Sequence, residues 1–187
     1  GRTLLSFFAA FVAAVIFSVL AVLFPPIDKA LSPIVIITRA VPTMSVILFA
    51  LIWFTDAITP LFIAFLVIFP TLYASFYSAL INVNNDEMEM AKAYKVKRIY
   101  VIKDLYYPAV LPRFLDAMRS ALSLNVKLII AAEVLASTRY SIGEMMQLSK
   151  LYLETADLLA WTIMAIIMSY LLELSVLGLR KLLVRWG

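Results

Sequence analysis

Long apolar stretches alternate with short polar ones along the chain, and five of the apolar stretches are long enough to cross a membrane. An α-helix needs about 20 mainly apolar residues to span the hydrocarbon core of a bilayer. The pattern therefore predicts an all-α integral membrane protein with about five transmembrane helices. The five stretches are residues 4–24, 31–54, 60–80, 113–135 and 156–179.

Prolines and one cation modify two of these predicted helices. The second stretch contains Arg39 and Pro42, so we expect a broken or bent helix whose strongly apolar part is residues 44–54. The third stretch contains Pro70, which predicts a kink. Because the sequence shows no internal repeat, we expect residues 1–187 to form a single transmembrane domain.

The composition fits a lipid environment and excludes most enzyme chemistry. Of the 187 residues, 64% are hydrophobic and 15% are charged, whereas about a quarter of the residues of a soluble domain are charged. The absence of cysteine and histidine excludes disulfides, thiol nucleophiles, Cys/His zinc sites and histidine bases. We expect no metal site, no cofactor bound by this chain, no nucleic-acid partner and no enzymatic activity.

Basic residues gather in two segments, one after the third stretch and one at the C-terminal end. The positive-inside rule places both segments in the cytoplasm, which leaves the N-terminus outside. Arg2 mildly disagrees with this orientation, and an upstream first helix that this chain lacks would explain its abrupt start. The two segments contain Lys92, Lys95, Lys97, Arg98 and Lys103, and Arg180, Lys181 and Arg185.

The polar segment at residues 82–103 predicts a loop helix. Asn84 is placed to cap its N-terminus, and Glu87 follows three residues later, as in a variant of the capping box. Acidic residues come first and basic residues last, which suits the helix dipole. Two interpretations stay open, a solvated loop helix and a docking helix for a cytoplasmic partner. Five less polar residues favour docking slightly: Met88, Met90, Ala91, Tyr94 and Val96.

In the same segment, Glu89-Met90-Ala91 is followed nineteen residues after the glutamate by Pro108, and then by Leu111-Pro112. This series resembles the "EAA" loop of the permease subunits of binding-protein-dependent ABC importers. The resemblance covers nearly the whole chain and is closest to the nitrate/sulfonate/taurine branch, which includes permeases for thiamine precursors. Further matches in the same order are Arg39 to Pro42, Trp53-Phe54, Arg119 with Ala121, Ala132-Glu133 and Ser141-Ile142-Gly143.

Two positions of the loop depart from the family pattern. Met90 replaces the first alanine of the motif, which is a mild change, and Lys95 stands where the family has glycine. A glycine would permit a sharp break between two short helices, because it adopts a positive φ at little cost. Lysine adopts a positive φ only at a cost, so Lys95 predicts a more continuous helix.

The resemblance implies a type I ABC importer permease with a cytoplasmic coupling loop at about residues 82–107. It implies a bacterial or archaeal cytoplasmic membrane, a second permease copy (identical or homologous) and an extracytoplasmic solute-binding protein. A separate ABC ATPase would use ATP and Mg. The substrate would be a small solute such as a sulfonate, nitrate, taurine or a vitamin precursor. The expected ATPase-coupling residues are Glu87, Glu89, Met90, Ala91, Tyr94, Lys95 and Pro108.

Polar residues inside the spans are candidates for a translocation path, because polar groups in a membrane usually face protein or water. Ser120, Ser123 and Lys127 recur at positions i, i+3 and i+7 of a helix and therefore share one stripe. Lys127 would attract an anion such as a sulfonate or carboxylate, or else would pair or snorkel structurally. Tyr73 and Tyr77 on the third span could line the same path, although tyrosine is common at membrane interfaces.

The remaining charges within the spans are expected to be mainly structural. Asp116 lies three residues from both Arg113 and Arg119, which predicts pairing within one helix. Glu133 and Gly143 are candidates for an outer gate or a contact with the binding protein. The competing interpretation of Glu133 is an interfacial charge in water, which we slightly favour.

Two rival functions remain open at this point. An energy-coupling or scaffold subunit could dock an ATPase without binding substrate itself, and the loop would fit that function equally well. An intramembrane enzyme could be built from Ser120 or Ser123 with Lys127 as a Ser-Lys dyad, but no nucleophile turn or oxyanion donor is visible. No P-loop occurs in the sequence, so ATP hydrolysis would belong to a partner.

Overall fold

The computed structural model describes residues 1–183, apart from the side chains of Asn85 and Leu182. Arg185, part of the second basic segment, lies outside this range. The described part contains helices and no strand, which confirms the all-α prediction. In order, the helices are α1 (Arg2–Leu23), α2 (Pro25–Ala40), α3 (Thr43–Trp53), α4 (Thr59–Ile81), α5 (Asn85–Ala93), α6 (Arg98–Tyr100), the π-helix η1 (Val101–Tyr106), α7 (Tyr107–Ala136), α8 (Ile142–Leu151) and α9 (Thr155–Leu183).

Three helices of the described part, α1, α4 and α9, are long and apolar enough to cross a membrane. A fourth span is possible as the pair α2 and α3, which are bent by 99° at the break between them. This bend confirms the prediction of a broken second helix. The remaining predicted span is α7, whose 30 residues give a length of about 45 Å. Because of its charged residues, α7 is not among the helices whose apolar composition alone predicts a membrane span.

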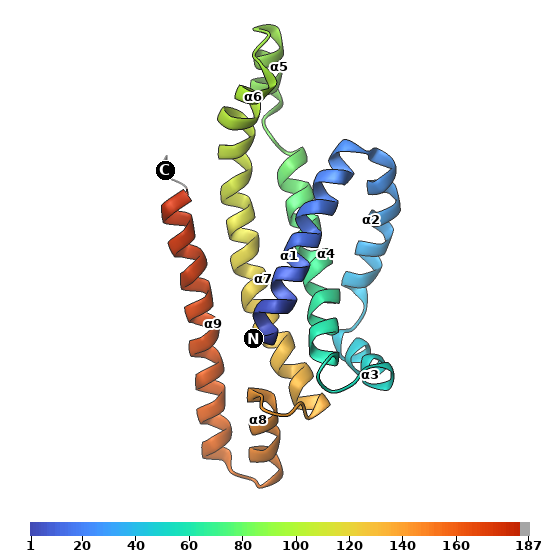
Figure 1. Cartoon of the computed structure of the whole chain (residues 1–187), viewed down its shortest axis with the longest axis vertical. Coiled ribbons are helices and arrows are strands. Elements are labelled where there is room, and N and C mark those ends of the chain that lie inside the picture. Colours follow the sequence, from blue (N-terminus) through green and yellow to red (C-terminus); the bar gives the residue numbers. More distant parts are fainter. Residues whose placement is uncertain (184–187) are drawn as a thin grey trace.

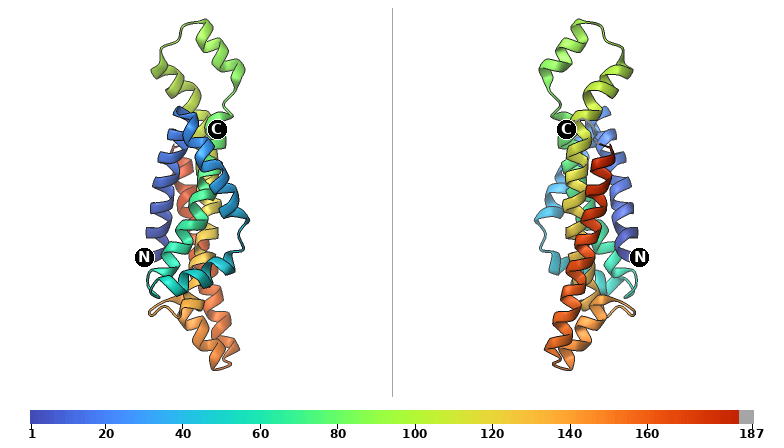
Figure 2. Two further views of the ribbon diagram at one scale, coloured as in Figure 1. Left: turned by 90° about the vertical axis from the view of Figure 1, so that its right-hand side faces the viewer. Right: turned by 90° about the vertical axis from the view of Figure 1, so that its left-hand side faces the viewer.

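The core of the bundle lies where α1, α4 and α7 meet. Ala10, Ala14 and Ser18 are fully buried along one side of α1, and small residues at this spacing let two helices approach closely. The ring of Phe76 on α4 stacks on Phe114 of α7 with centroids 4.0 Å apart. Figure 2 shows α1 and α2 on opposite sides of α4 and α7.

Helix α9 is attached differently, because among the described helices it packs mainly on α7 and α8. In Figure 1 it runs along one edge of the molecule, on the side of α7 away from α2. Much of its apolar surface is exposed, which suits contact with lipid. The exposed apolar residues of α9 include Leu159, Ile163, Ile166, Ile167, Leu171 and Leu174.

The segment from α5 to η1 projects beyond the helix bundle (Figures 1 and 2), and we call this the loop end of the molecule. The start of α5 follows the predicted capping pattern. The Asn84 side chain accepts a hydrogen bond from the Asp86 backbone N–H at 3.1 Å. Its Nδ2 donates to Glu87 Oε1 at 3.1 Å.

The prediction of a more continuous helix at Lys95 is wrong. Helix α5 ends at Ala93, and Lys95 adopts a φ of 51°. The Val96 N–H donates to the Ala91 carbonyl at 2.9 Å, and the Lys95 N–H to the Lys92 carbonyl at 3.0 Å. This is the Schellman pattern of a helix C-terminus, which satisfies carbonyls that the helix leaves free. These bonds offset the cost of a left-handed lysine, so the chain turns where the family has glycine.

The return from the loop into α7 passes through the π-helix η1. Pro108 and Pro112 lie in the first turns of α7 and lack the N–H groups that would bond to residues 104 and 108. The wider π-turn lies immediately before these two positions, at Val101–Tyr106. A π-helix accommodates such interruptions without ending the helical path, so α6, η1 and α7 run on from one another.

Candidate functional site

The first candidate surface is a groove in the projecting loop, between α5 and the segment α6–η1. It has a volume of about 450 Å³. Four of the seven expected coupling residues line it, because Glu87, Met90, Ala91 and Tyr94 share one face of α5. The rest of the lining is Val96, Tyr100, Val101, Asp104 and Leu105.

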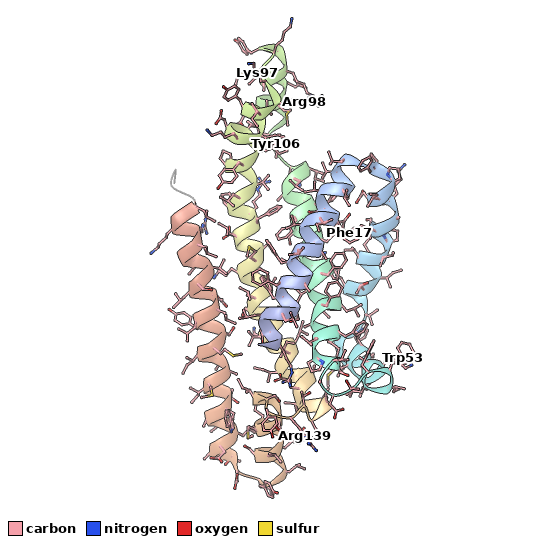
Figure 3. The ribbon with its side chains drawn as sticks, viewed as in Figure 1. Phe17, Trp53, Lys97, Arg98, Tyr106 and Arg139 are labelled. Carbon is pink, nitrogen blue, oxygen red and sulfur yellow. The ribbon has the colours of Figure 1, made fainter. Side chains whose placement is uncertain are left out.

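The other three expected coupling residues lie outside this groove. Glu89 is exposed on another face of α5, and no ion pair to it occurs among the described residues. Lys95 is exposed at the turn after α5, and Pro108 lies in the first turn of α7. Figure 3 shows Lys97 and Arg98 on the projecting loop and Arg139 near the opposite end of the molecule.

The second candidate surface is a polar groove on the helices themselves, formed by two adjoining hollows. One hollow, of about 660 Å³, lies between α4 and α7, and the other, of about 450 Å³, between α7 and α9. They share Asp116, Ser120 and Leu124, so they adjoin along this stripe of α7, and we call the two together the polar groove. Its remaining lining is Thr71, Ser75, Ser78, Ala79, Asn82, Arg113, Ala117 and Ala121 in the first hollow, and Arg119, Ser123, Lys127 and Glu173 in the second.

The structure brings Ser120, Ser123 and Lys127 together, since all three line the second hollow. Ser123 Oγ lies 3.4 Å from Ser169 Oγ on α9. Lys127 is exposed, and no carboxylate of the described residues lies within ion-pair distance of it. The predicted stripe therefore exists, and Lys127 is not part of a buried ion pair.

Tyr73 and Tyr77 do not join this stripe. The Tyr73 hydroxyl donates to Asp28 Oδ1 on α2 at 3.2 Å, and the two tyrosine rings stack with centroids 5.9 Å apart. Helix α4 contributes Thr71, Ser75 and Ser78 to the groove instead. Residues 73 and 75 point in roughly opposite directions, because each helical residue turns the side chain by about 100°.

Asp116 and Arg119 of α7 pair with α9 and not with one another. Arg119 Nε lies 3.0 Å from Glu173 Oε2, and Arg180 Nη1 lies 2.8 Å from Asp116 Oδ1. Arg113 Nη1 donates to the Asn82 backbone carbonyl at 2.9 Å. The prediction that Asp116 pairs within its own helix is therefore wrong. A neighbouring helix presents opposite charges at direct hydrogen-bond distance, which no sequence spacing within α7 reveals.

At the opposite end of α7, which we call the α8 end, Glu133 is buried and paired. Its Oε1 lies 3.4 Å from Arg2 Nη1 on α1, and Arg2 Nη2 donates to the Arg139 carbonyl at 3.3 Å. Only 8% of the Glu133 side chain is exposed. The interpretation of Glu133 as an interfacial charge in water is therefore wrong, because its side chain is buried and paired. The sequence does not reveal this pair, because Arg2 lies 131 residues away in the chain.

Gly143 lies in the first turn of α8, directly against Glu133. A Cβ added at Gly143 would lie 2.4 Å from the Glu133 Cβ and 2.6 Å from the Val134 backbone nitrogen. Only a residue without a side chain fits at this distance. The two residues expected at an outer gate, Glu133 and Gly143, therefore lie in a closely packed junction of α7 with α8.

Sequence reasoning missed a second buried contact between α1 and α7. Asn125 is fully buried. Its Nδ2 donates to the Thr3 carbonyl at 2.7 Å, and its Oδ1 accepts from Ser6 Oγ at 3.3 Å. An amide inside a predicted span is the signal that could have found it, because a buried amide needs partners within the protein.

The chain thus combines polar hollows on membrane helices with a projecting loop that exposes apolar side chains. Comparison with known proteins gives the family. The chain belongs to the family described as "Binding-protein-dependent transport system inner membrane component", whose model matches residues 6–186. It is a multi-pass inner-membrane permease of a binding-protein-dependent transport system, as the sequence motifs predicted.

Two relatives from Escherichia coli (strain K12) are similar to most of the chain. The taurine transport system permease protein TauC is 28% identical over 186 residues, which cover 99% of this chain and 67% of TauC. The putative aliphatic sulfonates transport permease protein SsuC is 26% identical over 151 residues, which cover 80% of this chain and 57% of SsuC. The chain thus spans roughly two thirds of the length of one relative and less of the other.

A solved structure confirms the fold class. A chain from inward-facing conformations of the MetNI methionine ABC transporter matches with a TM-score of 0.73, over 97% of this chain and 91% of that chain. The two sequences are only 17% identical, so this likeness concerns the fold alone, that of a type I importer permease.

Proposed function

We propose that this permease subunit lines one side of a translocation path for a small sulfonate-like solute, and that a second permease copy closes the path. The polar groove along α4, α7 and α9 carries this proposal. It holds Arg113, Asp116, Arg119 and Lys127 on a helix of the membrane bundle. Charged side chains at membrane depth are costly and face protein or water, so lipid alone is an unsuitable cover for this groove.

The relatives support the class of solute. TauC is named for taurine and SsuC for aliphatic sulfonates, and both classes of molecule carry a sulfonate group. An extracytoplasmic solute-binding protein would deliver the solute at the α8 end. Glu133 and Gly143 would then hold the junction of α7 with α8 on which that delivery acts.

The projecting loop would couple the path to an ABC ATPase that uses ATP and Mg. Met90 and Tyr94 are 58% and 80% exposed on a loop outside the bundle, and exposed apolar side chains of this kind mark an interaction surface. Glu87 and Ala91 share their groove, Glu89 is free to pair with a basic residue of the ATPase, and Lys95 and Pro108 shape the two turns of the loop.

Co-purification from gently solubilised native membranes, followed by mass spectrometry, tests the assembly. We expect an ABC ATPase in near-equal amount together with a solute-binding protein. An ATPase without any binding protein would favour an energy-coupling subunit that does not bind substrate. Absence of an ATPase would contradict the function proposed for the loop.

A charge reversal tests the loop residue by residue. We expect Glu89→Arg to abolish co-purification of the ATPase, because the substitution places a cation opposite the basic residue that Glu89 would meet. Glu154→Arg, at an exposed glutamate near the opposite end of the molecule, is the matched control and should leave association with the ATPase intact. Unchanged association and transport with Glu89→Arg would remove Glu89 from the coupling surface.

A further inference from the structure

We propose that the groove selects for an anionic group, and that Arg113 and Lys127 are the two residues that attract it. This inference rests on the proposed translocation path and assigns its specificity to two named side chains. The groove and the ion pairs at its edge contain four cations and two carboxylates, so the local charge is positive.

The ion pairs show which of these cations remain available. Arg119 is held by Glu173 at 3.0 Å, and Arg180 by Asp116 at 2.8 Å. Both carboxylates near the groove are therefore already offset by a cation on the neighbouring helix. The charge of Lys127 also acts on Glu173, but that carboxylate has its closer partner in Arg119.

Arg113 and Lys127 are the two groove cations without a carboxylate partner in the described part of the chain. Arg113 donates one hydrogen bond to a backbone carbonyl, which leaves its charge uncompensated. Both side chains are exposed on α7, where a solute in the groove could reach them. A net positive potential along the groove follows, and it is stronger in a partly water-excluded site than in bulk water.

The two cations are well separated along the groove, so an anion could contact them one after the other. They lie fourteen residues apart on one helix, which corresponds to about 21 Å. Ser120 lies midway between them and lines both hollows. Hydroxyl groups of Ser78 and Ser123 line the remaining length and can donate hydrogen bonds to an oxyanion, whereas the Ser75 hydroxyl donates to the Thr71 carbonyl. An anion could thus pass from Lys127, further from the loop end, to Arg113 near it.

The absence of cysteine from the sequence permits a direct measurement of this potential. In the importer complex reconstituted in phosphatidylcholine vesicles, Ser120→Cys is labelled with a negatively or a positively charged methanethiosulfonate reagent. The labelling of this chain is read by its mass. We expect the ratio of negative to positive labelling rates to fall about tenfold on adding Lys127→Met, and similarly on adding Arg113→Met. Lys29→Met, an exposed cation on α2, is the control and should leave the ratio unchanged.

The outcomes separate this inference from the proposed function. If Ser120→Cys reacts with neither reagent, the groove holds no water and the translocation path itself is contradicted. If it reacts with both reagents at a ratio that Lys127→Met and Arg113→Met do not change, the path stands and anion selection is wrong.

A final comparison identifies the source of the anion. Added methanesulfonate should slow the labelling of Ser120→Cys, and Lys127→Met should abolish this protection. Protection by phosphatidylglycerol in the vesicles, without protection by methanesulfonate, would assign the two cations to a lipid headgroup and overturn the inference.

Discussion

The two ends of α7 differ in which of their side chains are buried and which are exposed. At the α8 end, Glu133 is buried against Arg2, and Gly143 packs on its backbone. At the loop end, Met90 and Tyr94 expose apolar surface to solvent. Both ends contain non-glycine residues with positive φ, Ser137 and Lys95 among them. The α8 end buries a charged pair within the chain, although Tyr140 is exposed there, whereas the exposed apolar side chains of the loop end surround a groove.

This difference indicates where the permease needs a partner. A buried charge with its counter-ion in the same chain belongs to a rigid unit, because separating the pair leaves an uncompensated charge. An exposed apolar surface on a projecting loop gains free energy when a partner covers it. We therefore expect substitutions at the α8 end to affect stability and substitutions at the loop end to affect association.

The largest expected effect is from Arg2→Met. It removes the cation that offsets the buried carboxylate of Glu133, and we expect a loss of about 2–3 kcal/mol in the free energy of unfolding. The expected loss is at or below the lower limit of the cost of removing one partner from a buried ion pair, because Arg2 itself is 32% exposed. Thermal unfolding in detergent measures the change.

The double variant Arg2→Met with Glu133→Gln is the control for this prediction. A neutral amide has no charge to leave uncompensated, so the double variant should be more stable than Arg2→Met alone. If Glu133→Gln instead adds its own loss to that of Arg2→Met, the two side chains act independently and the α8 end is not held by their pairing.

The second effect in size is from Gly143→Ala. The new Cβ would meet backbone atoms of α7 that cannot rotate away, so we expect a loss of about 1–3 kcal/mol, as in overpacked cores. Gly178→Ala on α9 is a matched control, because nothing lies within 4 Å of a Cβ there. That control should be neutral or slightly stabilising, since alanine favours a helix. Equal losses in both variants would show that the loss does not come from the contact between Gly143 and α7.

The same comparison explains what could be predicted from the sequence. Local features were accessible: the apolar stretches, the break before α3 and the Asn84 cap all depend on residues close together in the chain. The stripe of Ser120, Ser123 and Lys127 depends only on helical periodicity. The pairs between α7 and α9, and between Arg2 and Glu133, could not be predicted, because their partners are separated by 54 to 131 residues.

Lys95 shows a different limit of sequence reasoning. Its intrinsic preference argues against a left-handed turn, yet the Schellman hydrogen bonds and the return of the chain into α6 impose one. The family's glycine at this position indicated the right geometry, and the residue type alone indicated the wrong one. Tertiary context outweighs a preference of about 1–2 kcal/mol per residue.

The third prediction follows from this turn. We expect Lys95→Gly to stabilise the loop by about 0.5–1 kcal/mol, because glycine adopts φ > 0 without strain but loses more conformational entropy on folding. Hydrogen exchange of the α5 amides measures the local change. Lys92→Gly, inside α5, should have the opposite sign and cost about 1 kcal/mol. Faster exchange in Lys95→Gly would mean that lysine stabilises the turn by contacts beyond its backbone.

The smallest expected effect on stability is from Tyr94→Ala. The side chain is 80% exposed, so we expect a change within about 0.5 kcal/mol in the free energy of unfolding. Association with the ATPase should nevertheless weaken by about tenfold or more, because tyrosine is frequent among the few residues that dominate an interface. The dissociation constant of the ATPase, measured with the permease in detergent, tests this separation of the two effects.

Tyr140→Ala is the matched control at the α8 end, where the tyrosine is 95% exposed. It should change neither stability nor ATPase association, since that end of the molecule is proposed to face away from the ATPase. If Tyr140→Ala weakens ATPase binding as much as Tyr94→Ala does, the effect on binding depends on the exposure of the tyrosine and not on its place in the loop groove. If Tyr94→Ala instead destabilises the fold, the loop groove is an internal contact of the permease, and the contrast between the two ends of α7 no longer holds.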